Sequence, residues 1–342
     1  MARKTERVRG KPVAALEAAR LYYLQDKKMD VIARELGVSR SSVSRLLSYA
    51  REVGLVDIRI NSPLELGGTL ERRIHERFGV TAHVVPMPQS VAEVERLERV
   101  ALTAGRMLGQ YVESGMLVGI AWGSTISAVS RELHRKPTRD TMIVQLNGAG
   151  NTLSTGVDYS SDILRRFGRA FDAQVQHFPV PAFFDSPLTR DAVWQERSTL
   201  RMLDLQAKLD LAVFSLGSPV ADVPSRVYVG GYLSKEDYQS LRDDKVVGDI
   251  ATVFFRSDGS WKDIALNARA TGPGIDLLHR VARRFCVVAG VKKLPPLRAA
   301  LAAGLITDVV LDETLAASLL ESEGIAAAPN QRVRTSGVDL AE

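Results

Sequence analysis

Apolar residues in the first sixty positions recur at helical spacing in three segments. The pattern covers Pro12–Gln25, then about Met29–Leu36, and then Ser39 to about Val53. Gly37 and Ser39 separate the last two segments. Glycine adopts the left-handed conformation that ends helices, and a serine side chain accepts a free N–H group where a helix starts. The pattern therefore predicts three helices, with a very short turn between the second and the third.

The turn between the second and third segments has the residue spacing of a helix-turn-helix. A small Ala33 is followed four residues later by Gly37 and six residues after that by the β-branched Val43. The alanine allows the two helices to approach closely, and the glycine makes the sharp turn. The predicted core between the helices consists of Ile32, Val38, Val43 and Leu46.

Polar residues occupy the outward positions of the third segment, and the surrounding sequence is basic. Residues 1–61 contain 13 Lys and Arg against 7 Asp and Glu, whereas the other 281 residues contain 32 against 33. A basic face is typical of polyanion binding, and short hydroxyls and arginines reach phosphates and base edges. An ordinary helical hairpin with a serine-rich surface is the alternative. We predict that the third helix contacts operator DNA through Ser39, Arg40, Ser41, Ser44, Arg45 and Ser48.

A change of pattern near residue 60 predicts a domain boundary. Val56, Ile58 and Ile60 alternate with polar residues, as in a half-exposed strand, before Asn61-Ser62-Pro63 breaks the pattern. We therefore assign residues 1–62 to a DNA-binding domain and residues 63–330 to a second domain that begins with a helix from about Leu66 to Phe78. Residues 331–342 have no apolar period, and we expect a disordered tail.

The second domain alternates short apolar runs with longer helical patterns. This alternation predicts an α/β fold of three layers, Rossmann-like, with a mostly parallel sheet covered on both faces. Ligands of such folds bind beyond the carboxyl ends of the strands, so the loops that follow the runs are candidate sites. The runs are AHVVPM, MLVGIAW, MIVQLNG, VQHFPVP, LDLAVFSL, IATVFF, CVVAG and DVVLD.

The first two of these loops contain residues suited to phosphate. Gly123, Ser124 and Thr125 connect a strand to a helix, whose N-terminus would direct N–H groups and a positive dipole at an anion. The alternative is that a hydroxyl merely caps the helix. Asn147 and Gly148 follow the next strand in a glycine-rich loop that lacks the GxGxxG spacing of dinucleotide sites.

Later loops add an acceptor and a cation. Gly217-Ser218 closes one strand, Asp249 precedes the ATVFF strand, and Lys292 follows VVAGV. Hydroxyls, one carboxylate and one lysine at successive strand ends are what a polyol phosphate requires. The alternatives are that Asp249 is a turn residue and that Lys292 is a solvated surface charge.

Composition restricts the remaining classes of protein. Hydrophobic residues make up 45% and charged residues 25% of the 342 residues, as in globular proteins, and no apolar run approaches the length of a membrane span. We expect a cytoplasmic protein with no cofactor. Cys286 is the single cysteine and lies in the apolar run FCVVAG, so we expect a buried thiol and no multi-cysteine metal site.

Several sequence blocks in the same order resemble one known family. These are LGVSRSSVSRLL, VGIAWGSTIS, QLNGAGN, VPAFFDSP, FSLGS, VGDIATVFF, VVAGVKK and ALAAGLITDVVLDETLA. Over nearly its whole length the chain resembles the SorC/DeoR-type sugar-binding transcriptional regulators. The resemblance implies a large domain similar to glucosamine-phosphate deaminase and ribose-phosphate isomerase, and homo-oligomers, dimers or tetramers, acting on operator DNA. It implies an effector pocket formed by Gly123, Ser124, Thr125, Asn147, Gly148, Asp249 and Lys292.

The chain departs from the family near its C-terminus, and one alternative function stays open. Where the family often has ITDE, this chain has ITDVVLDE, so that Asp312 and Glu313 are the counterparts. A sugar-phosphate isomerase or deaminase with a DNA-binding domain would need a general base, for which Asp249 is the candidate. None of the five histidines shares a strand-end loop with Asp249, and no metal-ligand spacing occurs. A pure interaction module would explain neither polar surface. We therefore expect a non-enzymatic regulator of carbohydrate metabolism whose repression is relieved by a sugar or sugar phosphate.

Overall fold

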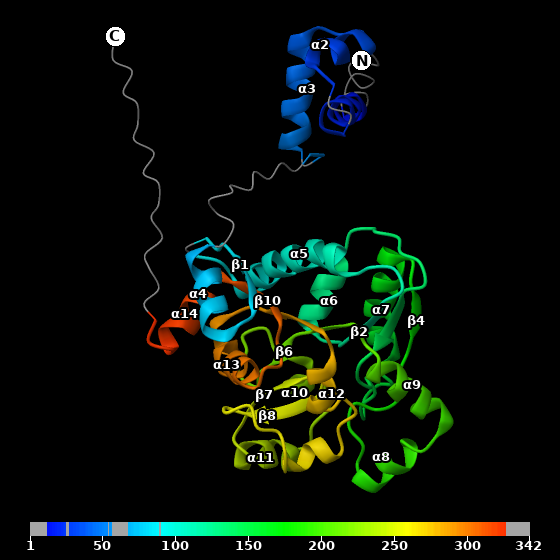
Figure 1. Ribbon diagram of the computed structural model, residues 1–342, viewed down its shortest axis with the longest axis vertical. Coiled ribbons are helices and arrows are strands. Elements are labelled where there is room, and N and C mark those ends of the chain that lie inside the picture. The colour runs from blue at the N-terminus through cyan, green and yellow to red at the C-terminus, as the bar shows by residue number, and fades with distance from the viewer. Residues whose placement is uncertain (1–11, 25–26, 54, 57–67, 89, 326–342) are drawn as a thin grey trace. The chain divides into compact units, whose positions relative to one another are not determined.

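The computed structural model describes residues 12–24, 27–53, 55–56, 68–88 and 90–325 (Figure 1). The chain divides into two compact units, Met1–Leu66 and Gly67–Glu342. This division and the predicted boundary after residue 62 both fall within 57–67, outside the described residues. The predicted strand residues Ile58 and Ile60, the expected start of a helix at Leu66 and the tail 331–342 also lie outside them.

The small unit contains the three predicted helices. The first covers residues 12–19 and continues as the π-helical turn η1 (Arg20–Leu24). α2 (Met29–Glu35) and α3 (Arg40–Glu52) follow. Gly37 has a φ of 64°, the left-handed conformation that the short turn requires. The Ser39 Oγ accepts the Ser42 N–H at 3.2 Å and so satisfies a free donor at the start of α3.

The core between α2 and α3 differs in part from the predicted one. Ile32 and Val43 are fully buried as expected, but Val38 is 38% exposed and Leu46 only partly buried. Because α3 begins at Arg40, Val38 lies in the turn before the helix and does not share its inward face. Leu47, one helical turn after Val43, is buried instead.

The large unit is built on a seven-stranded sheet in which every neighbouring pair is parallel. The register places Val118 opposite both Ile143 and Leu211 in the interior of the sheet. The predicted α/β class is confirmed. In spatial order the strands are β1 (Thr81–Val85), β10 (Asp308–Asp312), β9 (Arg283–Val288), β5 (Leu211–Phe214), β2 (Leu117–Ile120), β3 (Met142–Gln145) and β4 (Gln174–Gln176).

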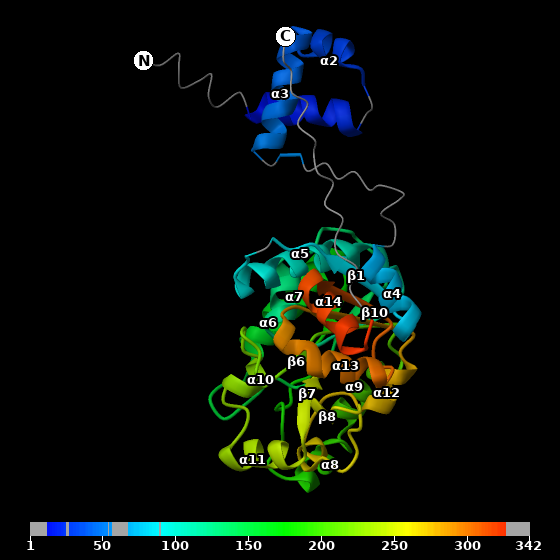
Figure 2. The ribbon, with the colours of Figure 1, turned by 90° about the vertical axis from the view of Figure 1, so that its left-hand side faces the viewer.

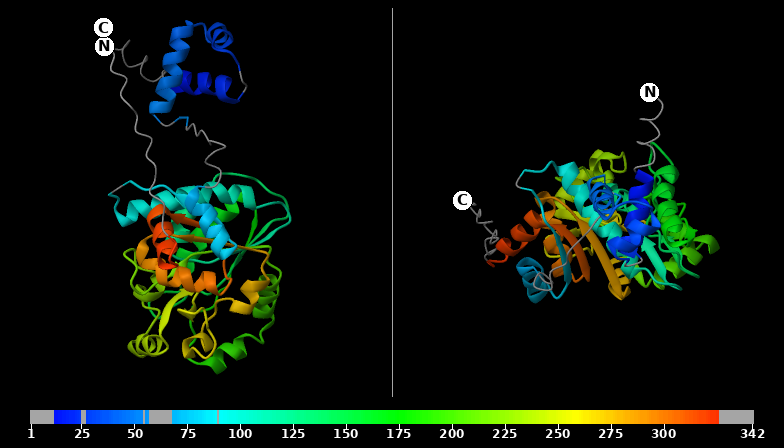
Figure 3. Two further views of the ribbon diagram at one scale, coloured as in Figure 1. Left: turned by 60° about the vertical axis from the view of Figure 1, so that its left-hand side comes forward. Right: turned by 90° about the horizontal axis from the view of Figure 1, so that it is seen from above.

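Helices cover both faces of this sheet and give three layers (Figures 1 and 3). Alternate strand residues face opposite sides, so that Val287 packs in one apolar core, while Cys286 and Val288 pack in the other. On the side of Val287 lie α5 (Glu93–Tyr111), α6 (Ser124–Arg131) and α7 (Val157–Phe171). On the other side lie α4 (Thr69–Phe78), α9 (Arg197–Ala207), α12 (Ile275–Arg280), α13 (Leu294–Ala302) and α14 (Glu313–Ser322).

A small antiparallel sheet lies outside the parallel one (Figure 2). It consists of β6 (Leu216–Gly217), β7 (Val246–Ile250) and β8 (Val253–Arg256). The run IATVFF, which the sequence predicted as one strand, therefore contains a turn at Ala251 and Thr252 and lies outside the parallel sheet. The remaining elements are α8 (Pro187–Val193), α10 (Arg226–Val229), α11 (Lys235–Asp243) and the 3-10 helices η2 (Ala265–Ala268) and η3 (Val291–Lys293).

The strand order contains one switch point, between β2 and β5. After β2 the chain continues to β3 on one side, whereas after β5 it leads, by way of the small sheet, to β9 on the other side. Loops that leave two neighbouring strands in opposite directions open a crevice at the carboxyl ends, where ligands of α/β proteins bind. Within the described ranges, no helix is long and apolar enough to cross a membrane.

Candidate functional site

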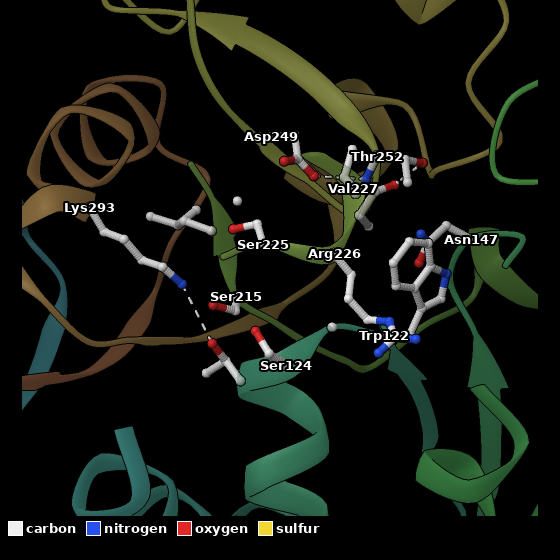
Figure 4. A pocket seen from close by; sticks show the side chains of 15 residues that line it. Trp122, Ser124, Asn147, Ser215, Ser225, Arg226, Val227, Asp249, Thr252 and Lys293 are labelled. Atoms are coloured by element: carbon white, nitrogen blue, oxygen red, sulfur yellow. Dashed lines mark hydrogen bonds between the residues drawn. The ribbon is translucent and has the colours of Figure 1, made fainter. Parts of the chain in front are cut away.

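A cavity lies at this switch point, between the carboxyl ends of β2 and β5 and the small antiparallel sheet. It contains about 400 Å³ of space between atoms, part of which is open solvent. We call it the switch-point cavity (Figure 4). Its lining residues are Trp122, Gly123, Ser124, Thr125, Asn147, Ser215, Leu216, Gly217, Ser225, Arg226, Val227, Asp249, Ala251, Thr252 and Lys293.

The N-terminus of α6 forms one wall of the switch-point cavity. Gly123 precedes the helix with a φ of 148°, a conformation that side chains other than glycine rarely adopt. Neither Ser124 nor Thr125 occupies the N-cap position, which is Gly123, and the helix start has no side-chain cap. The first N–H groups of α6 and the Ser124 hydroxyl are therefore available to an anion in the cavity (Figure 4).

The lysine in the cavity is Lys293, and the predicted Lys292 lies outside the lining. The Lys293 side chain is buried, with 6% of the residue exposed, and its Nζ donates to Thr125 Oγ1 at 3.5 Å. Burial lowers its pKa to about 8. Lys292 has 58% of its side chain exposed and pairs with Asp222 at 2.5 Å. Successive residues of the 3-10 turn η3 point about 120° apart, which is why only one of the two lysines reaches the cavity.

Asp249 lines the cavity from within β7, and not from a turn as the alternative reading supposed. It pairs with Gly217, where a Cβ would stand 1.8 Å from Asp249 Oδ1, so glycine is required there. Oδ2 accepts the Thr252 N–H at 3.2 Å, whereas Oδ1 is buried near the Tyr228 hydroxyl without a hydrogen bond of ordinary geometry. Burial raises the pKa of Asp249 to about 6.

The turn that follows Asp249 is strained. Ala251 and Thr252 have φ values of 46° and 71°, a pair of left-handed residues in a two-residue hairpin. Such turns favour glycine or asparagine, and a β-branched residue in this conformation costs of order 1–3 kcal/mol. Strain of this kind collects at functional sites, and here both residues line the switch-point cavity.

The loop after β3 contains the predicted residues Asn147 and Gly148. Asn147 lines the cavity, whereas Gly148 is not among the lining residues. Asn147 is almost fully buried, and its Oδ1 has no hydrogen-bond partner. The Gly148 carbonyl accepts Trp122 Nε1 at 2.8 Å, and a Cβ at this glycine would meet the Pro181 carbonyl oxygen at 2.3 Å. Gly148 therefore allows close packing that holds the wall in place.

Besides Lys293, sequence reasoning missed four polar residues of the cavity: Ser215, Ser225, Arg226 and Thr252. Ser215 follows β5 directly, and its buried hydroxyl has no hydrogen-bond partner. Its place at a strand end was a usable sign. Arg226 stacks on the Tyr159 ring, with its Cζ 4.0 Å from the ring centre, and lies in the long segment between β6 and β7, where no apolar period marks its position.

The outward face of α3 presents the residues predicted to contact DNA. All of them are exposed except Ser48, which is half-buried. Ser39 Oγ lies 2.8 Å from Ser41 Oγ, and Arg45 Nε donates to the Ser41 carbonyl at 3.3 Å. Arg40 is 3.5 Å from Asp30, an exposed pair that contributes little stability. Hydroxyls and two guanidinium groups on one helical face can contact phosphates and base edges together.

A metal site and a reactive thiol were the other chemistry to consider. In the part of the chain that the structure describes, no group of three His, Cys, Asp or Glu side chains is placed to hold a metal ion. Cys286 is fully buried in β9, and burial raises its pKa to about 12, as expected of an inert thiol.

Comparison with known proteins agrees with this architecture. The family model described as "Putative sugar-binding domain" matches residues 63–321. The deoxyribonucleoside regulator of Bacillus subtilis (strain 168) is 30% identical over 315 residues, which are 91% of this chain and 98% of that protein. The sorbitol operon regulator of Klebsiella pneumoniae is 25% identical over 307 residues, 90% of this chain and 97% of that protein.

Solved structures also match this chain. The crystal structure of a domain of "a possible sugar-binding transcriptional regulator" from Arthrobacter aurescens TC1 is 52% identical, with a TM-score of 0.69, and covers 75% of this chain and 98% of that one. Full-length SorC from Klebsiella pneumoniae has the same fold, with a TM-score of 0.77 at 24% identity, 90% of this chain and 97% of that one being covered. The predicted resemblance is confirmed: the chain belongs to the SorC/DeoR-type family of sugar-binding transcriptional regulators.

Proposed function

We propose that the switch-point cavity is the effector site of this regulator and that it binds a sugar phosphate. The observation that carries the proposal is the set of buried oxygens without hydrogen-bond partners on Asn147, Ser215 and Asp249, all of which line the cavity. Leaving a buried polar group unsatisfied costs about 1–3 kcal/mol, so native structures seldom keep several together without a ligand that pairs with them.

The arrangement suits the two ends of a sugar phosphate. The uncapped start of α6 and Lys293 supply N–H donors and positive charge for the phosphate. Asp249 and Asn147 supply acceptors for sugar hydroxyls, and Ser215 can either donate or accept. The relatives whose names refer to sorbitol and deoxyribonucleosides support a sugar or polyol as the effector, and the phosphate is inferred from the start of α6 and from Lys293.

The α3 face supports operator DNA as the second partner. We infer that α3 is the recognition helix and lies in the major groove, where its arginines and serines contact bases and phosphates. A homo-oligomer, dimer or tetramer, would place two such helices on the half-sites of one operator. The effector then acts by binding the DNA-competent and DNA-released states unequally.

The test is a thermal-shift screen of the full-length chain against matched pairs of sugars and their phosphates. A ligand at about 100 times its dissociation constant should stabilise the fold by about 2.7 kcal/mol, and we expect phosphates to exceed the parent sugars. Operator titrations with and without each hit then show whether the ligand releases DNA, as repression relieved by an effector requires. If none of the sugar phosphates stabilised the protein, the proposal would be overturned.

A second candidate is catalysis on the same sugar phosphate, because the pKa of Asp249, raised to about 6, suits a general base. The described residues that line the cavity include no histidine to act as a partner acid. Incubating each hit with the protein and analysing the product by NMR separates the two functions. We expect the sugar phosphate to be recovered unchanged.

A further inference from the structure

Asp312 is a buried carboxylate whose role is not explained by the cavity lining. It lies at the end of β10 with 0% of its surface exposed, and it precedes α14. Its Oδ1 accepts the Leu315 N–H at 3.0 Å, which caps α14. Its Oδ2 accepts the Gly290 N–H at 2.7 Å, a bond that a helix cap does not require. One carboxylate thus joins the start of α14 to the turn that follows β9.

The turn held by Asp312 carries the cavity lysine. Gly290 has a φ of 91°, and its carbonyl accepts the Lys293 N–H at 3.0 Å, closing the turn through η3. A Cβ on Gly290 would stand 2.9 Å from Glu93 Oε2, so the turn is confined from the side of α5 as well. The position of Gly290 therefore decides where Lys293 begins and whether its side chain points into the cavity.

Arg96 of α5 also holds the carboxylate in place. Its Nη1 donates to Asp312 Oδ1 at 2.8 Å and to Thr314 Oγ1 at 3.1 Å, and its Nε donates to Glu93 Oε1 at 3.1 Å. The Arg96 side chain is nearly buried, so this ion pair is shielded from water. Three elements that are distant in sequence meet at Asp312, and each contact restrains the direction of its two oxygens.

We propose that Asp312 is a positioning residue of the effector site, which acts by holding the Gly290 turn so that Lys293 points into the switch-point cavity. The proposal rests on the proposed function, in which Lys293 contacts the effector phosphate. It assigns a role to Asp312, one of the two residues that are the counterparts of the family's ITDE in this chain. The alternative is that Asp312 only caps α14 and stabilises the fold.

The test measures the environment of Lys293 without any ligand. Four proteins are compared as full chains by urea unfolding between pH 7.5 and 10: wild type, Lys293→Met, Asp312→Asn and the double variant. A lysine with a lowered pKa binds fewer protons than the unfolded chain between about pH 8 and about pH 10.4. The stability of wild type relative to Lys293→Met should therefore rise with pH across that window.

In the Asp312→Asn background this pH dependence should disappear, because a released Lys293 reaches water and titrates as an ordinary lysine. The titratable groups that face Lys293 are Cys286 of β9 and Asp249 of β7, and both are present in all four proteins. Persistence of the wild-type pH dependence in the Asp312→Asn pair would overturn the proposal, because a helix cap alone would lower stability equally at every pH.

Two further variants keep the test decisive. Gly290→Ala moves the same turn with Asp312 intact, through its positive φ and its contact with Glu93, and should remove the pH dependence as well. If Asp312→Asn does not fold, this variant replaces it in the comparison with Lys293→Met. Asp308→Asn is the matched control: it removes a buried carboxylate, paired with Arg283, from the opposite end of β10, and should leave the pH dependence unchanged.

Failure of the proposed function can be distinguished from failure of the role proposed for Asp312. If the ligand-free measurement gives the expected result but no sugar phosphate stabilises wild type, Asp312 positions Lys293 in a cavity whose ligand is of another class. If sugar phosphates bind but Asp312→Asn retains the pH dependence, the effector site stands and the role of Asp312 is only structural.

Discussion

The two polar surfaces of this chain satisfy their side chains in opposite ways. On α3, exposed serines bond to one another and Arg45 bonds to a neighbouring carbonyl, while water can satisfy the remaining donors. In the switch-point cavity, Asn147, Ser215 and Asp249 each bury an oxygen without a partner. An exposed polar face costs the fold little, whereas buried unpaired groups cost about 1–3 kcal/mol each until a ligand pairs with them.

The two surfaces should therefore support different kinds of recognition. The α3 face presents exposed cations and hydroxyls to a polyanion, so its affinity should depend strongly on salt concentration. The cavity presents fixed, desolvated groups and should discriminate between ligands by their hydroxyl and phosphate positions, since a mismatched ligand leaves a buried group unpaired. Substitutions on the two surfaces should therefore separate affinity for DNA from response to the effector.

The largest effect is expected from removing both arginines of the α3 face. Arg40→Ala combined with Arg45→Ala should weaken operator binding by about 1–3 kcal/mol for each arginine that contacts a guanine. A phosphate contact would instead lower affinity for all sequences alike and reduce the salt dependence. Titrations of operator and unrelated DNA at several salt concentrations distinguish the two. Arg99→Ala, an exposed arginine of α5 paired with Glu95, controls for lost net charge.

The next largest change, in affinity for the effector, is expected at one of two adjacent lysines that the sequence does not distinguish. Lys293→Met should remove a charge-assisted contact and weaken effector binding by about 1.5–3 kcal/mol without changing operator affinity. Lys292→Met should change neither, because Lys292 is exposed and pairs with Asp222. Calorimetric titration with the best sugar phosphate of the screen measures both. Equal losses in the two variants would show that the buried lysine is not the phosphate contact.

Asp249→Asn should weaken effector binding and stabilise the free protein. The pKa of Asp249 is raised to about 6, so the folded state binds more protons than the unfolded state between about pH 4 and pH 6. The free energy of unfolding therefore falls as pH rises through that window. Above about pH 6 the buried carboxylate is charged, and it destabilises the fold by the full amount. At pH 7.5 the variant should be more stable than wild type by on the order of 2 kcal/mol, and by less at pH 5. Urea unfolding at both pH values checks this, and a variant less stable at pH 7.5 would contradict it.

Most of the fold could be predicted because local patterns determine it. Seven of the eight apolar runs became strands of the parallel sheet, and Gly37 with Ser39 marked the turn before α3. The prediction that IATVFF forms one strand was wrong. The run contains a turn in which Ala251 and Thr252 adopt left-handed conformations that neither residue favours. Strain that tertiary packing imposes leaves no mark in the propensities of the residues that carry it.

The candidate site could be predicted by its loops but not by each side chain. Gly123, Ser124 and Thr125 follow β2 directly, and the rule that ligands bind at carboxyl ends was sufficient to find them. Choosing between Lys292 and Lys293 required the turn geometry set by Gly290, which depends on Asp312 from a strand about twenty residues later. Sequence pattern shows periodicity within an element, whereas such a choice depends on contacts between elements.

The smallest changes in affinity and stability are expected from replacing two serines at helix starts. Ser124 begins α6 without a capping bond, whereas Ser234 caps α11 by accepting the Asp237 N–H at 3.1 Å. Ser124→Ala should therefore leave the free energy of unfolding unchanged and weaken effector binding by about 0.5–1.5 kcal/mol, the net worth of one hydrogen bond. Ser234→Ala should do the reverse, lowering stability by about 0.5–2 kcal/mol with effector affinity preserved. Urea unfolding and effector titration of both variants give four numbers. If Ser124→Ala lowered stability and left affinity intact, its hydroxyl would be a structural cap and the phosphate would have to be held by the backbone of α6 and Lys293 alone.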